Sequence, residues 1–187
     1  MILKKVINLC KNREHIALFN AGDRQWISDG FAVYPLEGVP FFDAESLMAV
    51  FDIKGKKKEK MAKYHFSELP EQYCFDDVCE EETLCEMHPF KICIDSVTYT
   101  QVLTSKGCEF VSNKYLEPLK DTNEDMMGIY ERFTADGNSY FVVKDGLLLI
   151  ALILPVKVLN DKTMSDLKMF VNRCEVRMKN EEGQDGE

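Results

Sequence analysis

The sequence predicts an α+β fold made of repeats of a helix plus a three-stranded antiparallel meander, with the helices packed on one face of the sheets. Two observations support this prediction. An amphipathic helical pattern precedes three extended runs near the N-terminus, and the same order returns after residue 107. The tight-turn dipeptides Asp29-Gly30 and Asp145-Gly146 separate extended runs in the two copies.

The first copy begins with a helix over residues 2–12. Its apolar positions share one side of the helix, namely Ile2, Leu3, Val6, Ile7 and Cys10, while the lysines fall largely on the other side. The runs HIALFN, RQWIS and FAVYPL follow between residues 15 and 36. Their alternating pattern and the intervening turns predict three strands, and Trp26 on the second is expected to be at least half covered.

The second copy begins with the stretch GCEFVSNKYLEPLKD, residues 107–121. An apolar run ends at Asn113, which we expect to cap a helix over 113–121. Pro118 lies about one turn inside, so this helix should be short or irregular. The runs MMGIYERFT, SYFVVK and LLLIALIL then predict the second meander.

A third, weaker copy is predicted at residues 39–53. Asp43 should cap a helix there that carries Leu47, Met48, Val50 and Phe51 toward the core. Residues 54–90 lack periodicity and are interpreted as an irregular excursion within a domain of residues 1–160. An amphipathic helix is expected at 161–179, packed beside residues 154–158, and a disordered tail at 180–187.

Composition limits the class of protein. A length of 187 residues suits one domain, or two small ones that share a core. The net charge of −9 argues against a uniformly basic nucleic-acid-binding protein but permits one basic face. Seven scattered cysteines indicate reduced thiols and a cytoplasmic location. The longest apolar run, residues 147–156, is too short to span a bilayer, so no membrane association is expected.

Three stretches resemble the DNA sliding clamps, the processivity factors of replicative polymerases: FVSNKYLEPL, WISDGFAVYPL and LILPVKV. They occur in the order that the clamps have. The resemblance implies a clamp-like fold and a non-enzymatic role in DNA replication or processivity. It also implies possible homo-oligomers, because this length cannot encircle a duplex alone. The alternative is a protein-interaction module of the same fold that does not bind DNA.

The resemblance also implies two sites. Clamp helices turn polar faces to double-stranded DNA, which makes Lys4, Lys5, Lys11 and Lys114 the candidate DNA contacts, although Glu45 and Asp52 on the 43–52 helix would repel phosphate. The second site is a groove for apolar peptide motifs of replication or repair proteins. Its candidate residues are Asp29, Gly30, Phe31, Leu154, Pro155, Val156, Lys157 and Val158.

No catalytic residue, cofactor or metal site is expected. The three histidines are scattered, and no phosphate loop, nucleophile elbow or metalloprotease helix occurs. Cys74, Cys79, Cys85 and His88 could together hold zinc, but their spacing is not that of paired zinc knuckles. Buried or incidental cysteines are the simpler interpretation.

Overall fold

The computed structural model describes residues 2–120, 126–158, 165, 169–170 and 172–173. The chain divides into two units, Met1–Val156 and Lys157–Glu187. The helices of the first unit are α1 (Leu3–Arg13), α2 (Ala44–Val50), α3 (Lys56–Lys60) and α4 (Asn113–Leu116), and the last continues into the short 3-10 helix η1 (Glu117–Leu119). The strands are β1 (His15–Ala21), β2 (Arg24–Ser28), β3 (Ala32–Leu36), β4 (Ala62–Phe66), β5 (Thr83–Ile94), β6 (Val97–Thr104), β7 (Gly107–Ser112), β8 (Met127–Phe133), β9 (Ser139–Asp145) and β10 (Leu148–Ile153).

The predicted fold class is wrong. Within the described residues, one ten-stranded mixed sheet replaces the repeated units of helix and meander, in the order β4-β1-β2-β3-β10-β9-β8-β5-β6-β7. The two meanders exist, but β3 pairs with β10 and joins them edge to edge. β4 adds a parallel partner to β1. Among the described residues the helices are few, and the longest one, α1, has 11 residues.

Several elements agree with the sequence prediction because short-range signals define them. Asp43 caps α2 and exchanges hydrogen bonds with Ser46 in a capping box. Gly30 and Gly146 have positive φ values of 92° and 60° in the predicted turns. The helix predicted at 113–121 is short, as Pro118 requires: α4 has four residues and is followed by η1.

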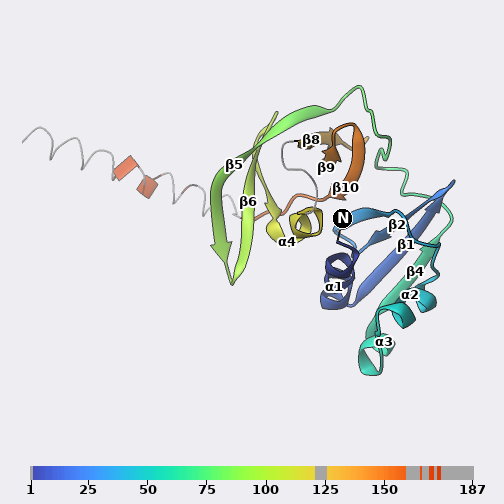
Figure 1. Cartoon of the computed structure of the whole chain (residues 1–187). Coiled ribbons are helices and arrows are strands. Elements are labelled where there is room, and N and C mark those ends of the chain that lie inside the picture. The colour runs from blue at the N-terminus through green and yellow to red at the C-terminus, as the bar shows by residue number, and fades with distance from the viewer. Residues whose placement is uncertain (1, 121–125, 159–164, 166–168, 171, 174–187) are drawn as a thin grey trace, which may run out of the picture. The chain divides into compact units, whose positions relative to one another are not determined.

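Other local predictions are wrong. Asn113 is the first residue of α4, not its cap, and its side-chain oxygen accepts a 2.5 Å hydrogen bond from Thr100 on β6. The third copy has no meander, since α2 is followed by α3 and β4, and Val50 is exposed. The presumed excursion contains α3, β4 and the start of β5. β5 and β6 are long, curved strands near one end of the sheet, and α4 lies beside them (Figure 1).

Both faces of the central strands are buried. Ile16 and Leu18 of β1 join the larger apolar cluster, to which α1, α2 and α4 also contribute. Ala17 and Phe19 point the opposite way, into a second cluster with Trp26. The second cluster is covered by residues 67–82, the connection between β4 and β5, which we call the strap. Trp26 is 2% exposed, so its predicted coverage is confirmed.

The C-terminal predictions fall mostly outside the described residues. Of the predicted helix at 161–179, the described residues 165, 169–170 and 172–173 are helical. The tail at 180–187 lies outside the described part of the chain. The packing of the C-terminal helix beside residues 154–158 stays a prediction.

Candidate functional site

A groove crosses five strands on the strap side of the sheet. Register pairs join Tyr64 of β4 to Ala17, Ala17 to Ser28, Ser28 to Val33 and Val33 to Leu152 of β10. All five side chains line the groove, which has a volume of about 510 Å³. The three central residues of this row are small, so the sheet surface is low along it.

Bulky residues on either side of this row give the groove its depth. Two positions along the strands, Phe66 of β4 and Phe19 of β1 form the next row and line the groove; Trp26 of β2 continues this row but is buried against the strap and does not line the groove. Phe19 and Phe66 stack with their ring centroids 5.1 Å apart. Toward the other end of the strands, His15 and Phe31 form the opposite wall. The groove is therefore a channel of small residues between two aromatic walls.

The wall at Phe31 is fixed by the turn between β2 and β3. Asp29 is buried, and its Oδ1 accepts hydrogen bonds of 3.0 Å from the backbone N–H groups of Phe31 and Ala32. The Gly30 N–H donates a hydrogen bond to the Ser28 hydroxyl at 2.9 Å, so the one hydroxyl among the three small floor residues already has a partner. The Arg13 guanidinium lies 4.1 Å from the centre of the Phe31 ring. The turn thus fixes the backbone at Phe31, a residue that lines the groove and also packs against the larger apolar cluster.

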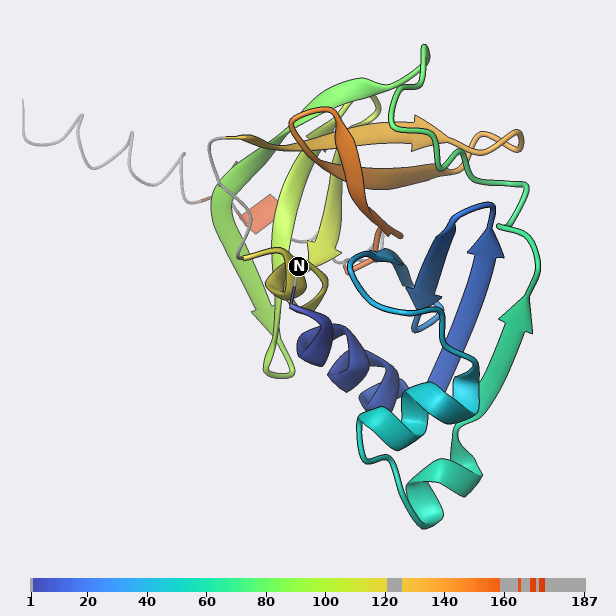
Figure 2. The same cartoon turned by 45° about the vertical axis from the view of Figure 1, so that its right-hand side comes forward.

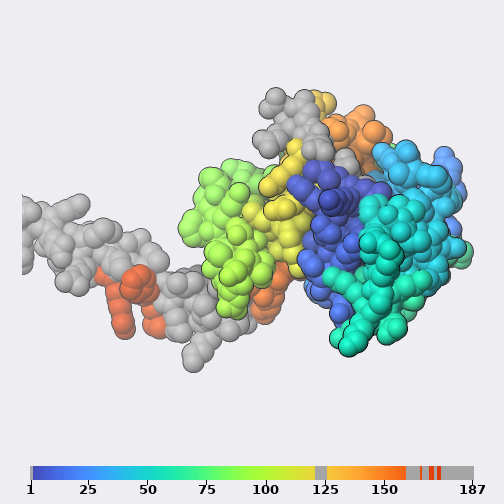
Figure 3. All heavy atoms as spheres, turned by 60° about the horizontal axis from the view of Figure 1, so that its bottom comes forward, coloured from blue at the N-terminus to red at the C-terminus, as the bar shows by residue number. Residues whose placement is uncertain are grey.

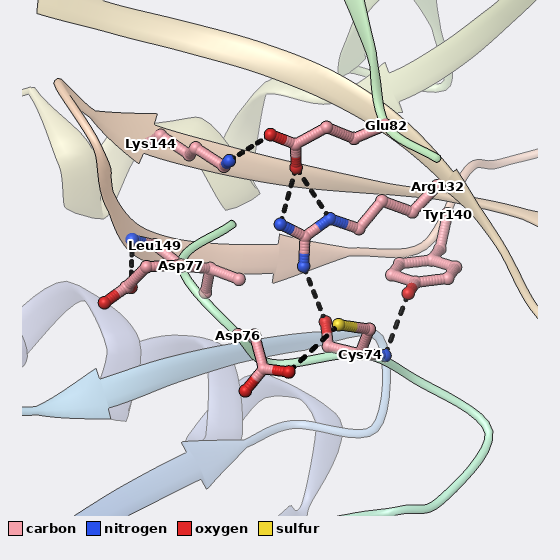
Figure 4. Close-up of polar contacts among 8 residues, drawn as sticks. All are labelled: Cys74, Asp76, Asp77, Glu82, Arg132, Tyr140, Lys144 and Leu149. Carbon is pink, nitrogen blue, oxygen red and sulfur yellow. Dashed lines mark hydrogen bonds and ion pairs between the residues drawn. The ribbon is translucent and has the colours of Figure 1, made fainter. Parts of the chain in front are cut away.

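The strap supplies the remaining wall through Leu69, Pro70 and Tyr73. A buried ionic cluster holds its end (Figure 4). Glu82 accepts hydrogen bonds from Nε of Arg132, at 2.9 Å, and from Lys144. Arg132 and Lys144 are 1% and 3% exposed, so Glu82 compensates two cations that water does not reach.

Burial raises the pKa of Glu82, but the hydrogen bonds from Lys144 and Arg132 outweigh it and hold the pKa below its usual value. Further contacts secure the middle of the strap. Arg132 donates to the Cys74 carbonyl at 2.9 Å, and the Cys74 N–H donates to the Tyr140 hydroxyl at 2.9 Å. Burial also raises the pKa of Tyr140. The Phe75 ring meets Trp26 edge-on at 5.2 Å. The strap is therefore a fixed part of the domain.

The structure separates the predicted partner-site residues. Gly30, Phe31 and Leu154 line the groove together, and the Leu154 N–H donates to the Phe31 carbonyl at 2.9 Å. Asp29 has a structural role in the turn. Pro155 lines a different hollow, and the Val156 N–H donates to Phe110 of β7. Lys157 and Val158 belong to the second unit.

The predicted DNA contacts do not share one free surface. α1 lies between α4 and the α2–α3 segment (Figures 2 and 3). Lys5 donates to the Glu117 carbonyl of η1 at 3.2 Å, and Lys11 donates to the Phe51 carbonyl at the end of α2 at 3.0 Å. Lys114 lies 4.8 Å from the centre of the Tyr115 ring. Lys4 is exposed. Two of these four lysines thus act as hydrogen-bond donors between helices.

Three of the four possible zinc ligands, Cys74, Cys85 and His88, have separate surroundings, while Cys79 lies close enough to Cys74 to interact with it electrostatically. Cys74 lies in the strap, the Cys85 thiol faces the Thr83 carbonyl, and His88 Nδ1 accepts from the Phe90 N–H. Across the described part of the chain, no group of three or more metal-binding side chains is arranged to hold an ion.

Sequence reasoning missed most of the groove. The strap residues carry no periodic signal, and the small residues Ala17, Ser28 and Val33 become one surface only through strand register.

In the described ranges, no helix combines the length and apolar character that crossing a membrane requires. Comparison of the chain with protein-family models, curated proteins and solved structures gave no match.

Proposed function

We propose that this chain is a non-enzymatic protein-interaction module that binds a short apolar peptide segment of a partner protein in the groove. The observation that supports this proposal is the row of small residues from Tyr64 to Leu152, bounded by aromatic walls. Binding sites combine such apolar linings with a few polar groups that fix orientation.

A peptide suits the groove better than a ligand that requires many polar contacts. The Ser28 hydroxyl accepts from the Gly30 N–H, and its neighbours Ala17 and Val33 are apolar, so the polar side chains of the lining, such as His15, Glu68 and Gln72, are few beside the apolar ones. The walls are held before any ligand arrives, on one side by the Asp29 turn and on the other by the Glu82 cluster. A rigid site lowers the entropy cost of binding.

The test is selection of binders from a random dodecapeptide library displayed on phage, with the full chain immobilised. We expect enriched peptides to share two or more aliphatic or aromatic residues at fixed spacing. The variant Ala17→Phe should abolish enrichment, because its side chain extends from the floor into the groove. Ala49→Phe, at an exposed position of α2, is the matched control and should leave enrichment unchanged.

Selection of no common sequence, or equal selection by Ala17→Phe, would overturn the proposal. Both variants must first show the unfolding transition of the parent protein. Sedimentation at the concentrations used shows whether a second copy of the chain occupies the groove instead of a peptide.

The DNA-associated role expected from the clamp resemblance stays a prediction, as do homo-oligomers and the cytoplasmic location. The hydrogen bonds of Lys5 and Lys11 to backbone carbonyls do not favour this role.

A further inference from the structure

Among the described residues, the groove lining contains one acidic side chain, Glu68, and one histidine, His15, which lies on the opposite wall. Glu68, the second residue of the strap, is the only carboxylate among the described residues that line the groove, and no lysine or arginine is among them. Its side chain is exposed, and within the described part of the chain it forms no hydrogen bond or ion pair. The acidic groups nearest in sequence on the strap, such as Glu71, do not line the groove.

The residues beside Glu68 influence how strongly its carboxylate interacts with a bound cation. Phe66, the last residue of β4, lies two positions before Glu68, and Leu69 and Pro70 follow it, so the exposed carboxylate has apolar groove-lining neighbours along the chain. A charge beside apolar groups experiences a lower effective dielectric constant than one on an open polar surface. On the opposite wall, Arg13 is held between Phe31 and Asp29 and does not line the groove.

We propose that Glu68 selects peptides in which a lysine or arginine adjoins the apolar residues that fill the groove. This inference rests on the proposed function and specifies the chemistry of the partner. The net charge of −9 acts in the same direction, because it favours the approach of basic segments.

The known strength of exposed ion pairs predicts how much Glu68 changes the affinity for a basic peptide. An ion pair at a solvent-accessible rim changes affinity by roughly two- to fivefold. The contribution should therefore appear as specificity within an apolar sequence. It should also diminish at 1 M salt, where charges are screened over about 3 Å.

The experiment uses the sequence enriched from the dodecapeptide library. Three synthetic versions carry lysine, glutamine or glutamate at the position where basic residues are enriched, with both peptide ends blocked. Dissociation constants are measured by fluorescence polarisation against the parent chain, Glu68→Gln and Glu68→Lys. Glu71→Lys is the control, since it makes the same change of charge at an exposed strap position that does not line the groove.

We expect the parent protein to bind the lysine peptide roughly two- to fivefold more tightly than the glutamine peptide. Glu68→Gln should remove this preference, and Glu68→Lys should reverse it in favour of the glutamate peptide. Glu71→Lys should keep it. The glutamine peptide should bind all four proteins with similar affinity, because its contacts are apolar.

Different results would overturn the role of Glu68 and the proposed function. A groove-dependent consensus without a basic residue, or a lysine preference that Glu68→Gln retains, would overturn the role of Glu68 and leave the proposed function standing. Absence of any groove-dependent consensus would overturn both.

Discussion

Glu82, the last residue of the strap, accepts a 2.9 Å hydrogen bond from Nε of Arg132 on β8, and the Arg132 side chain is 1% exposed. The pair connects a segment without regular structure to the middle of the sheet. Because strap residues also form one wall of the groove, stability and binding depend on the same contact.

Replacing Glu82 should destabilise the protein strongly. In Glu82→Gln, Arg132 and Lys144 remain buried without a compensating charge, so the free energy of unfolding should fall by about 3 kcal/mol. The measurement is urea denaturation followed by Trp26 emission, since Phe75 of the strap packs against Trp26. Glu81→Gln, at an exposed neighbouring position, should change the free energy by less than about 0.5 kcal/mol. Equal effects of the two variants would show that the cluster does not hold the strap.

The same cluster makes stability depend on pH. The folded protein lowers the pKa of Glu82 from its usual value of 4.5, so the unfolded chain binds the proton more readily. The stabilisation is therefore present above about pH 4.5 and is lost as the pH falls through the lower pKa of the folded state. The difference in stability between the parent protein and Glu82→Gln should be constant at pH 6–8 and should shrink below pH 4.5. A gap that stays constant down to pH 3 would contradict this.

A buried hydrogen bond links the first meander to α4. The Tyr34 hydroxyl of β3 donates to the Tyr115 carbonyl at 2.7 Å, and Tyr34 is 1% exposed. Tyr34→Phe leaves that carbonyl without its partner and should reduce the free energy of unfolding by about 1–2 kcal/mol. Tyr99→Phe is the control, since the Tyr99 hydroxyl makes no hydrogen bond among the described residues. Similar urea midpoints for the two variants would refute the expected difference.

The predicted DNA contacts can be tested together with their structural roles. If the four lysines bind duplex phosphates, the alanine variant of Lys4, Lys5, Lys11 and Lys114 should bind duplex DNA more weakly, with a shallower salt dependence. Lys5→Ala and Lys11→Ala should also lower stability by about 0.5–1.5 kcal/mol each, because each side chain donates to a backbone carbonyl. Lys4→Ala, at an exposed position, should leave stability unchanged. Duplex affinity with an unchanged salt slope would exclude these lysines as contacts.

Local chemistry was readable from the sequence. Asp43 caps α2, Pro118 shortens the helix that begins at Asn113, and Gly30 and Gly146 turn the chain where the sequence predicts turns. Each of these features depends on hydrogen bonds or backbone angles within a few residues. The exception shows the limit of such reasoning: Asn113 suits a cap, yet its side chain accepts from Thr100 on another strand.

By itself, the sequence determined where most strands and turns of the two meanders lie and that Trp26 on the second strand is covered. Only the tertiary structure decided that β3 pairs with β10, that β4 runs parallel to β1, and that the row from Tyr64 to Leu152 forms a groove. The physical reason is that strand alternation specifies which face a side chain occupies, but not which strand becomes its neighbour. The strap follows the same rule, because Glu82 finds Arg132 and Lys144 at separations of 50 and 62 residues, where no local pattern connects them.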